Sequence, residues 1–184
     1  TLDFHHRSNS YMNEVIDDRE GLPITLSVLF MELAKRLELK VAGLGLPGHF
    51  LAMYRKPQPL EIEKKDRDRN TTRHEIIIDA FGGKIIDRKE AARLTGFALE
   101  DLAFEPSTKK EIIKRILRNL VQVAGREKDP VSQTRYLDTI LAISPDDRYS
   151  RAQRAMIYYV REEFERALSD IDYLLDSDPE SPEN

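Results

Sequence analysis

The chain has 184 residues and a mass of 21.3 kDa, enough for one domain with a hydrophobic core and a short helical extension. Apolar residues make up 40% and charged residues 34%, which is typical of a globular protein and disfavours wholesale disorder. No apolar stretch approaches the ~18 residues of a membrane helix, and a net charge of -4 gives no reason to expect nucleic acid or an anionic membrane as partner.

The sequence contains no cysteine. This excludes a disulfide, a thiolate metal site and a cysteine nucleophile anywhere in these residues. His5 and His6 lie beside Asp3, but adjacent histidines of this kind are interpreted as exposed loop residues, so no metal and no cofactor is expected. No basic-then-apolar signal segment is present, and we therefore expect a cytoplasmic protein.

The first predicted element is a helix over residues 23–39. It begins after Gly21 and Leu22 with Pro23, which is favoured in a first turn because its missing N–H has no intrahelical partner to lose. Apolar and small residues recur at three- and four-residue spacing along this segment, as in a helix with a buried face: Ile24, Ser27, Val28, Met31, Ala34 and Leu37.

Short strands are predicted next, over residues 40–46, 49–55 and 73–79. Pro47 and Gly48 form the first turn, and the pair Gly82 and Gly83 forms a hairpin turn that leads to a last strand at residues 85–86. Residues 56–72 are highly charged and are predicted to be a surface loop. Short helices are predicted over residues 88–94 and 98–103, followed by a long helix that is capped near Thr108 and ends near Gly125.

The remaining sequence contains an internal repeat. The segment before Pro145 recurs before Pro179, a spacing of 34 residues, which is the tetratricopeptide period. On this reading, Ala155 lies on a first helix and Ala167 on a second, at positions where tetratricopeptide helices place small packing residues. The alternative is a plain antiparallel helix pair. One complete repeat is too short for a free-standing solenoid.

The tetratricopeptide reading has a functional counterpart. The concave face of such helices would present Arg151, Arg154, Tyr158 and Tyr159 to a protein partner, which makes these four the candidate partner-binding residues. The alternative is that they face solvent without a partner or pack on the core. Residues 161–184 carry two basic and nine acidic residues, a bias that is typical of a solvated helix face.

His49 and Asp79 are the residues in the first half that could carry chemistry. His49 begins an apolar strand directly after a turn, and Asp79 ends an isoleucine run one strand later. Burying an unpaired carboxylate is costly, so Asp79 is expected to have a partner. If the two strands are neighbours, Asp79 could orient the His49 imidazole as the acid of a catalytic triad orients its base.

These residues and their order resemble a known family. A glycine at a helix start, then Gly-His-Phe at 48–50 and Ile-Asp-Ala-Phe at 78–81, is similar to the transglutaminase-like core of the papain-like cysteine enzymes. The segments 9–13, 19–27, 45–50 and 78–81 resemble, more closely, the bacterial SirB-type proteins, which join a transglutaminase-like domain to tetratricopeptide-like helices. The resemblance implies an α+β fold with a helix packed on an antiparallel sheet, followed by an all-α tail.

The same resemblance implies roles for single residues. His49 matches the base and Asp79 the orienting acid, but the position of the cysteine nucleophile is occupied by Pro23. Two nearby hydroxyls do not replace it. Thr25 lies roughly 200° around the helix from Pro23, and Ser27 lies about 6 Å further along, where we expect a core position.

The sequence therefore predicts two domains: a transglutaminase-like core over residues 1–104, with the N-terminal part of the family domain missing, and a tetratricopeptide-like region over residues 105–184. The function expected is that of a non-catalytic binding or regulatory module with a protein partner. One alternative is a hydrolase or transferase of altered chemistry that uses His49 and Asp79. Another is a pure tetratricopeptide scaffold. The oligomeric state stays open.

Overall fold

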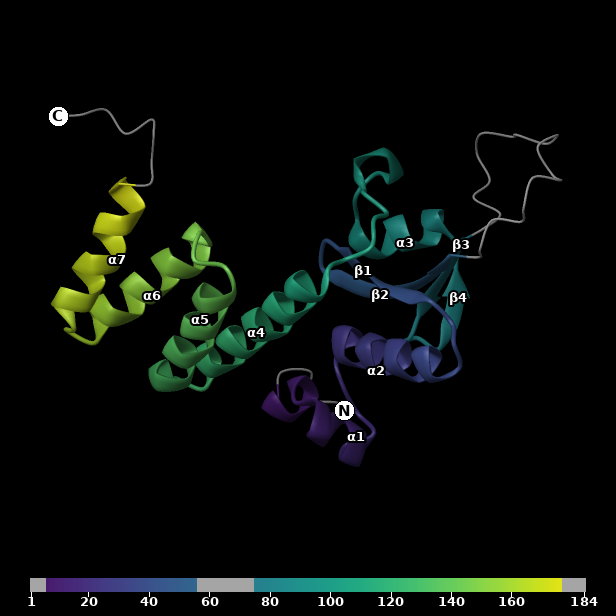
Figure 1. Cartoon of the computed structure of the whole chain (residues 1–184), viewed down its shortest axis with the longest axis horizontal. Coiled ribbons are helices and arrows are strands. Elements are labelled where there is room, and N and C mark those ends of the chain that lie inside the picture. The colour runs from purple at the N-terminus through teal and green to yellow at the C-terminus, as the bar shows by residue number, and fades with distance from the viewer. Residues whose placement is uncertain (1–5, 56–74, 177–184) are drawn as a thin grey trace, which may run out of the picture. The chain divides into compact units, whose positions relative to one another are not determined.

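A computed structural model describes residues 6–55 and 75–176 (Figure 1). Two compact units divide the chain near Ile112: the first contains residues 8–112, and the second contains residues from 113 onward together with Arg7. The predicted loop over residues 56–72, His5 and His74 lie outside the described residues.

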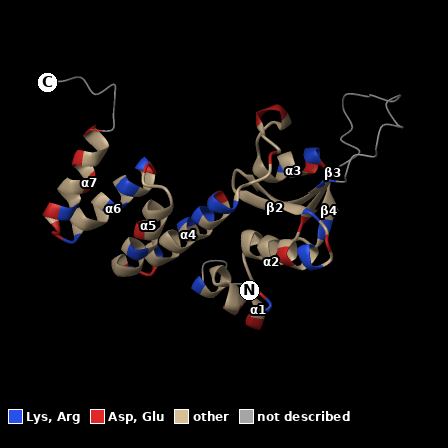
Figure 2. Ribbon diagram, viewed as in Figure 1, with Lys and Arg blue, Asp and Glu red and all other residues tan. Residues whose placement is uncertain are grey.

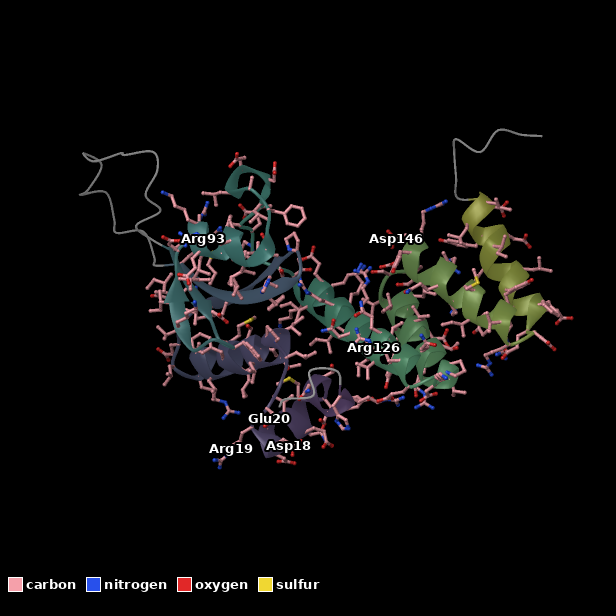
Figure 3. All side chains as sticks on the ribbon, turned by 180° about the vertical axis from the view of Figure 1, so that it is seen from behind. Asp18, Arg19, Glu20, Arg93, Arg126 and Asp146 are labelled. Carbon is pink, nitrogen blue, oxygen red and sulfur yellow. The ribbon has the colours of Figure 1, made fainter. Side chains whose placement is uncertain are left out.

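The first unit begins with helices. After the 3-10 turn η1 (Arg7–Ser10), helix α1 spans Met12–Asp18. It ends where Arg19 takes a left-handed conformation with φ 57°, and the side chains of Asp18, Arg19 and Glu20 point outward there (Figure 3). The short helix α1 has no counterpart among the predicted elements.

Helix α2 spans Pro23–Arg36 and begins with its proline in the first turn, as predicted. It ends three residues before the predicted boundary at Leu39. The reason is local: Glu38 adopts φ 60°, and the N–H of Leu39 turns back to the carbonyl of Ala34 at 2.9 Å. Such a left-handed residue closes a helix by satisfying its last carbonyls.

The four strands form one antiparallel sheet in the order β1-β2-β3-β4. They are β1 (Val41–Leu46), β2 (His49–Arg55), β3 (Glu75–Asp79) and β4 (Lys84–Ile86). The turn between β1 and β2 uses Pro47 and Gly48, the latter at φ +70°, a conformation that favours glycine. The predicted strands and their hairpin order are confirmed.

The sheet lies between two helices. Helix α2 contacts β1 and β2, and α3 (Arg88–Thr95) covers the opposite face (Figure 1). The apolar core on the α3 side is drawn from all four strands, from α3 and from the segment that follows it: Leu44, Leu46, Leu51, Met53, Ile77, Ile86, Ala91 and Phe104. The helix predicted over residues 98–103 is wrong, because only the 3-10 turn η2 (Leu99–Asp101) forms there.

The later part of the chain is helical, as predicted. Helix α4 (Lys109–Arg126) begins with a capping box, in which the N–H of Glu111 bonds to Thr108 Oγ1 and the N–H of Thr108 bonds to Glu111 Oε2. It is followed by α5 (Pro130–Ile143), α6 (Arg148–Val160) and α7 (Phe164–Asp176). Helices α4 and α5 share an apolar core: Leu120, Val121, Ala124, Tyr136, Leu137 and Ile140. Helix α6 packs on α5 and on α7. The α+β class with a helical tail is thus confirmed.

Candidate functional site

The N-terminus of α2 is the position where the sequence resemblance expects a nucleophile. Pro23 is the first residue of the helix and is half-buried. Gly21, two residues earlier, is closely surrounded by side chains: a Cβ there would lie 2.8 Å from Thr25 Oγ1 and 3.0 Å from Val15. The N–H of Leu22 donates to the carbonyl of Asn9 at 3.3 Å. The helix tip is therefore built of backbone and apolar groups.

Neither nearby hydroxyl is available as a nucleophile. Thr25 is fully buried, and its Oγ1 donates to the carbonyls of Asn9 at 2.8 Å and Leu22 at 3.1 Å. Ser27 is fully buried as well, which confirms its predicted core position. An acyl-transfer nucleophile must reach its substrate and have a base beside it. Through its hydrogen bond to Asn9, Thr25 instead holds α2 against the 3-10 turn η1.

His49 is the first residue of β2, opposite Leu46 in the β1–β2 register, and is half-buried. Asp79 is the last residue of β3. Alternation along β2 and the pairing of Met53 with Ile77 place both candidates on the same face of the sheet. The structure thus puts the two positions on neighbouring strands, as the prediction requires. The hydrogen bond between them stays a prediction.

Asp79 has a partner that sequence reasoning did not name. Its Oδ1 accepts a hydrogen bond of 2.8 Å from the N–H of Gly82 in the β3–β4 turn. The contact is so close that a Cβ at Gly82 would clash with Asp79 Oδ2. The acid at the end of the isoleucine run is therefore paired with backbone, as aspartates in turns commonly are. Asp79 therefore has a structural role in the β3–β4 turn that is independent of any contact with His49.

The four predicted partner-binding residues divide into two groups. Arg151, Arg154 and Tyr158 take part in packing α6 against α7. The Arg151 guanidinium lies 3.6 Å from the centre of the Tyr173 ring, and the guanidinium of Arg166 on α7 lies 5.5 Å from that of Tyr158. Tyr158 is buried, whereas Tyr159 is 61% exposed. Only Tyr159 among the four is an open surface residue.

Asp170 on α7 holds the two arginines and was not identified from the sequence. It is 2% exposed, lies 3.1 Å from Arg151 and accepts two hydrogen bonds from Arg154. These hydrogen bonds raise the pKa of Arg154 above its usual range. Burial raises the pKa of Tyr158. One feature of the sequence could have identified Asp170 as buried: it lies about one turn after Ala167, on the face that α7 buries.

A second buried acid joins α4 to α6. Asp147 caps α6 by accepting from the N–H of Ser150 at 3.1 Å. Its other oxygen accepts from Lys114 at 3.2 Å and from Arg118 at 2.7 Å, and its side chain is only 6% exposed. Capping and ion pairing on one carboxylate explain why it tolerates burial. This cluster has a structural role, because it joins α4 to the start of α6.

Within residues 6–55 and 75–176, no group of three or more His, Cys, Asp or Glu side chains could hold a metal ion. Over the same ranges, no helix has the length and apolar character needed to span a bilayer.

Comparison with known proteins gives several relatives. A UPF0162 protein of Xylella fastidiosa is 31% identical over 179 residues, covering 92% of this chain and 58% of the relative. Protein SirB1 of Salmonella typhimurium is 22% identical over 180 residues, covering 94% of this chain and 61% of SirB1. F-box only protein 21 of Homo sapiens is 28% identical over 163 residues, which cover 86% of this chain and 25% of that protein.

The chain thus spans about three-fifths of the length of these bacterial relatives and a quarter of the F-box protein. No solved structure gives a significant match. A family model described as the transglutaminase-like superfamily matches residues 1–118, a segment that contains Pro23, His49 and Asp79. The chain belongs to the transglutaminase-like superfamily and, with SirB1 and the UPF0162 proteins as homologues, to its SirB-type family.

Proposed function

We propose that this chain is a non-catalytic transglutaminase-like protein that acts as a protein-binding or regulatory module in the cytoplasm. The observation that carries the proposal is the first turn of α2: Pro23, which the resemblance aligns with the nucleophile, begins the helix, and the neighbouring hydroxyls are buried. Proline has no nucleophilic, donor or titratable side-chain group. A base and its orienting acid cannot perform acyl transfer without a nucleophile or an activated water.

The helices of the second unit supply the proposed binding region. Helices α6 and α7 pack on each other, and α5 packs on α6, an arrangement compatible with one tetratricopeptide unit and the second helix of another. Because Arg151, Arg154 and Tyr158 are engaged in this packing, the proposed partner surface is the exposed side of α6 and α7 that includes Tyr159.

An acyl-transfer assay tests the proposal. The intact chain is incubated with a glutamine-containing peptide and a fluorescent primary amine, and in parallel with p-nitrophenyl acetate. Amine incorporation, ammonia release and ester hydrolysis are expected at the rate of buffer alone. The variants His49→Ala and Asp79→Asn should give the same background rate, because neither residue acts on a substrate.

The competing function is a hydrolase or transferase of altered chemistry that uses His49 and Asp79, and the placement of both on one sheet face favours it. A rate above buffer that disappears in His49→Ala, with the unfolding temperature unchanged, would establish that function and overturn the proposal. The variant Pro23→Cys is informative in the same assay. A rate gained only in this variant shows that the missing thiol alone keeps the chain inactive.

A further inference from the structure

Helix α7 keeps a stripe of apolar side chains in solvent. Four residues at three- and four-residue spacing are between 39% and 57% exposed: Phe164, Leu168, Ile171 and Leu175. At about 100° per residue, they fall within one narrow sector of the helix. The face that α7 buries is a different one, which contains Ala167 and Asp170. Soluble helices normally bury such a stripe, so this one is available to another element.

A second exposed stripe lies on α6. Tyr149, Met156, Tyr159 and Val160 are between 61% and 72% exposed. The rings of Tyr159 and Phe164 meet edge to face with centroids 5.9 Å apart, so the two stripes adjoin at the turn between the helices. Together these eight residues form what we call the α6–α7 apolar surface. Exposed apolar stripes that adjoin on two packed helices mark an interaction site more strongly than scattered exposed residues.

The exposed charges beside the α7 stripe are acidic, whereas α6 carries an exposed base, Arg148, beside Tyr149. Glu165, Asp172 and Asp176 are exposed and lie on one side of the α7 stripe, where Figure 2 shows acidic segments along the helix. The nearby base Arg166 is already paired with Glu163 at 2.9 Å. A second copy that packed α7 stripe against α7 stripe would bring acid against acid, and the carboxylates beside this stripe would repel an anionic membrane. A partner with basic residues beside its apolar side chains matches the charge.

We infer that the α6–α7 apolar surface docks an amphipathic α-helix of a protein partner, with an apolar seam bordered by lysine and arginine. The inference rests on the proposed function, because it names the partner class of that binding module. The expected shape follows from the paired helices. Units of this kind leave a face that a further helix covers, and amphipathic helices bind such faces through apolar anchors at i, i+3, i+4 and i+7.

The test uses a designed peptide of about 18 residues, five turns of helix, with leucines along one seam and lysines on both borders. A second peptide replaces every lysine with glutamate. Fluorescence anisotropy on the full chain should show binding of the lysine peptide and at least about tenfold weaker binding of the glutamate peptide. Raising the salt concentration should weaken binding of the lysine peptide, because salt screens exposed charge pairs.

Matched variants locate the site. Leu168→Glu changes a side chain that is 57% exposed and should weaken binding of the lysine peptide at least about tenfold. Leu33→Glu changes a leucine on α2 that is 50% exposed and should leave binding unchanged. Circular dichroism confirms that both variants keep their helices. Sedimentation of the peptide-free chain should show a monomer up to the concentrations used.

Equal binding of the two peptides, or equal behaviour of Leu168→Glu and wild type, overturns the inference. So does self-association that Leu168→Glu abolishes, because the occupant would then be a second copy. Acyl-transfer rates measured on the same samples separate the two proposals. Turnover by the wild type overturns the proposed function even if the peptide binds, whereas failure of the peptide experiment in an inactive chain overturns the docking surface alone.

Discussion

Arg154 donates a hydrogen bond to each oxygen of the Asp170 carboxylate. Arg154 Nε donates to Oδ2 at 2.8 Å and Nη2 donates to Oδ1 at 2.7 Å. A planar guanidinium matches a carboxylate in this two-bond geometry, which makes the pair directional as well as charged. Since Asp170 is 2% exposed, its charge depends on these donors. The pair fixes α6 against α7 and so holds the two stripes of the α6–α7 apolar surface together.

Asp170→Ala should destabilise the chain strongly, because it strands Arg151 and Arg154 beside an apolar helix face. The expected loss in the free energy of unfolding is about 3 kcal/mol, the lower end for breaking a buried pair, since the arginines retain some exposure. Urea unfolding measures it. Asp172→Ala, on the exposed side of the same helix, should change the value by less than about 0.5 kcal/mol. Equal losses in the two variants would refute the role of Asp170.

A double-mutant cycle decides whether His49 and Asp79 interact. His49→Ala should lower the unfolding temperature. Asp79→Ala should cost about 1 kcal/mol through its hydrogen bond to Gly82 alone. If the side chains are also paired, the double variant departs from additivity by more than about 0.5 kcal/mol. As control, His49→Ala is combined with Asp87→Ala, which removes the cap of α3 and should be additive. Additivity in both cycles would show that the pair does not exist.

Ser27→Ala tests whether Ser27 is a packing residue whose hydroxyl has no structural partner. Ser27 Oγ is buried without a hydrogen-bond partner among the described residues. Removing an unsatisfied hydroxyl should raise the free energy of unfolding by about 1 kcal/mol. Thr25→Val, two residues earlier on the same helix, should lower it by a similar amount, because Thr25 donates to the carbonyls of Asn9 and Leu22. A lower stability in Ser27→Ala would mean that the hydroxyl has a structural partner.

The loss of stability at low pH should depend on Asp129, the N-cap of α5. Hydrogen bonds from Ser132, and then from Arg7, hold the pKa of Asp129 well below its usual range. A carboxyl with a depressed folded pKa stabilises the protein above its unfolded pKa of about 3.9, and this contribution is lost as the pH falls through the folded value. Asp129→Asn keeps a capping side chain but does not titrate.

Thermal unfolding of wild type and Asp129→Asn from about pH 6 to pH 2 measures the effect. The wild type should lose stability more steeply below about pH 4. The exposed replacement Asp172→Asn should follow the wild type. A wild-type curve no steeper than that of Asp129→Asn would contradict the prediction.

Local signals explain which predictions were correct. Pro23 at the start of α2, Gly48 in the first hairpin and the Thr108 cap of α4 each act within one turn of the backbone, so their effect is visible in sequence. The boundary at Leu39 was wrong because the left-handed conformation of Glu38 is uncommon for a residue with a side chain. The helix predicted over residues 98–103 reduces to one 3-10 turn, since its short apolar pattern is also compatible with an irregular segment.

The sequence by itself determined the α+β class, the helical tail and the absence of a thiol at the start of α2, because composition, periodicity and residue identity do not depend on distant contacts. Tertiary structure decided what the charged and hydroxyl side chains do. It gave Thr25 the carbonyl of Asn9 as a partner, gave Asp79 the N–H of Gly82 as a partner and placed Asp170 between two arginines. A polar residue's role is set by what surrounds it, and those neighbours come together only when the helices and strands pack.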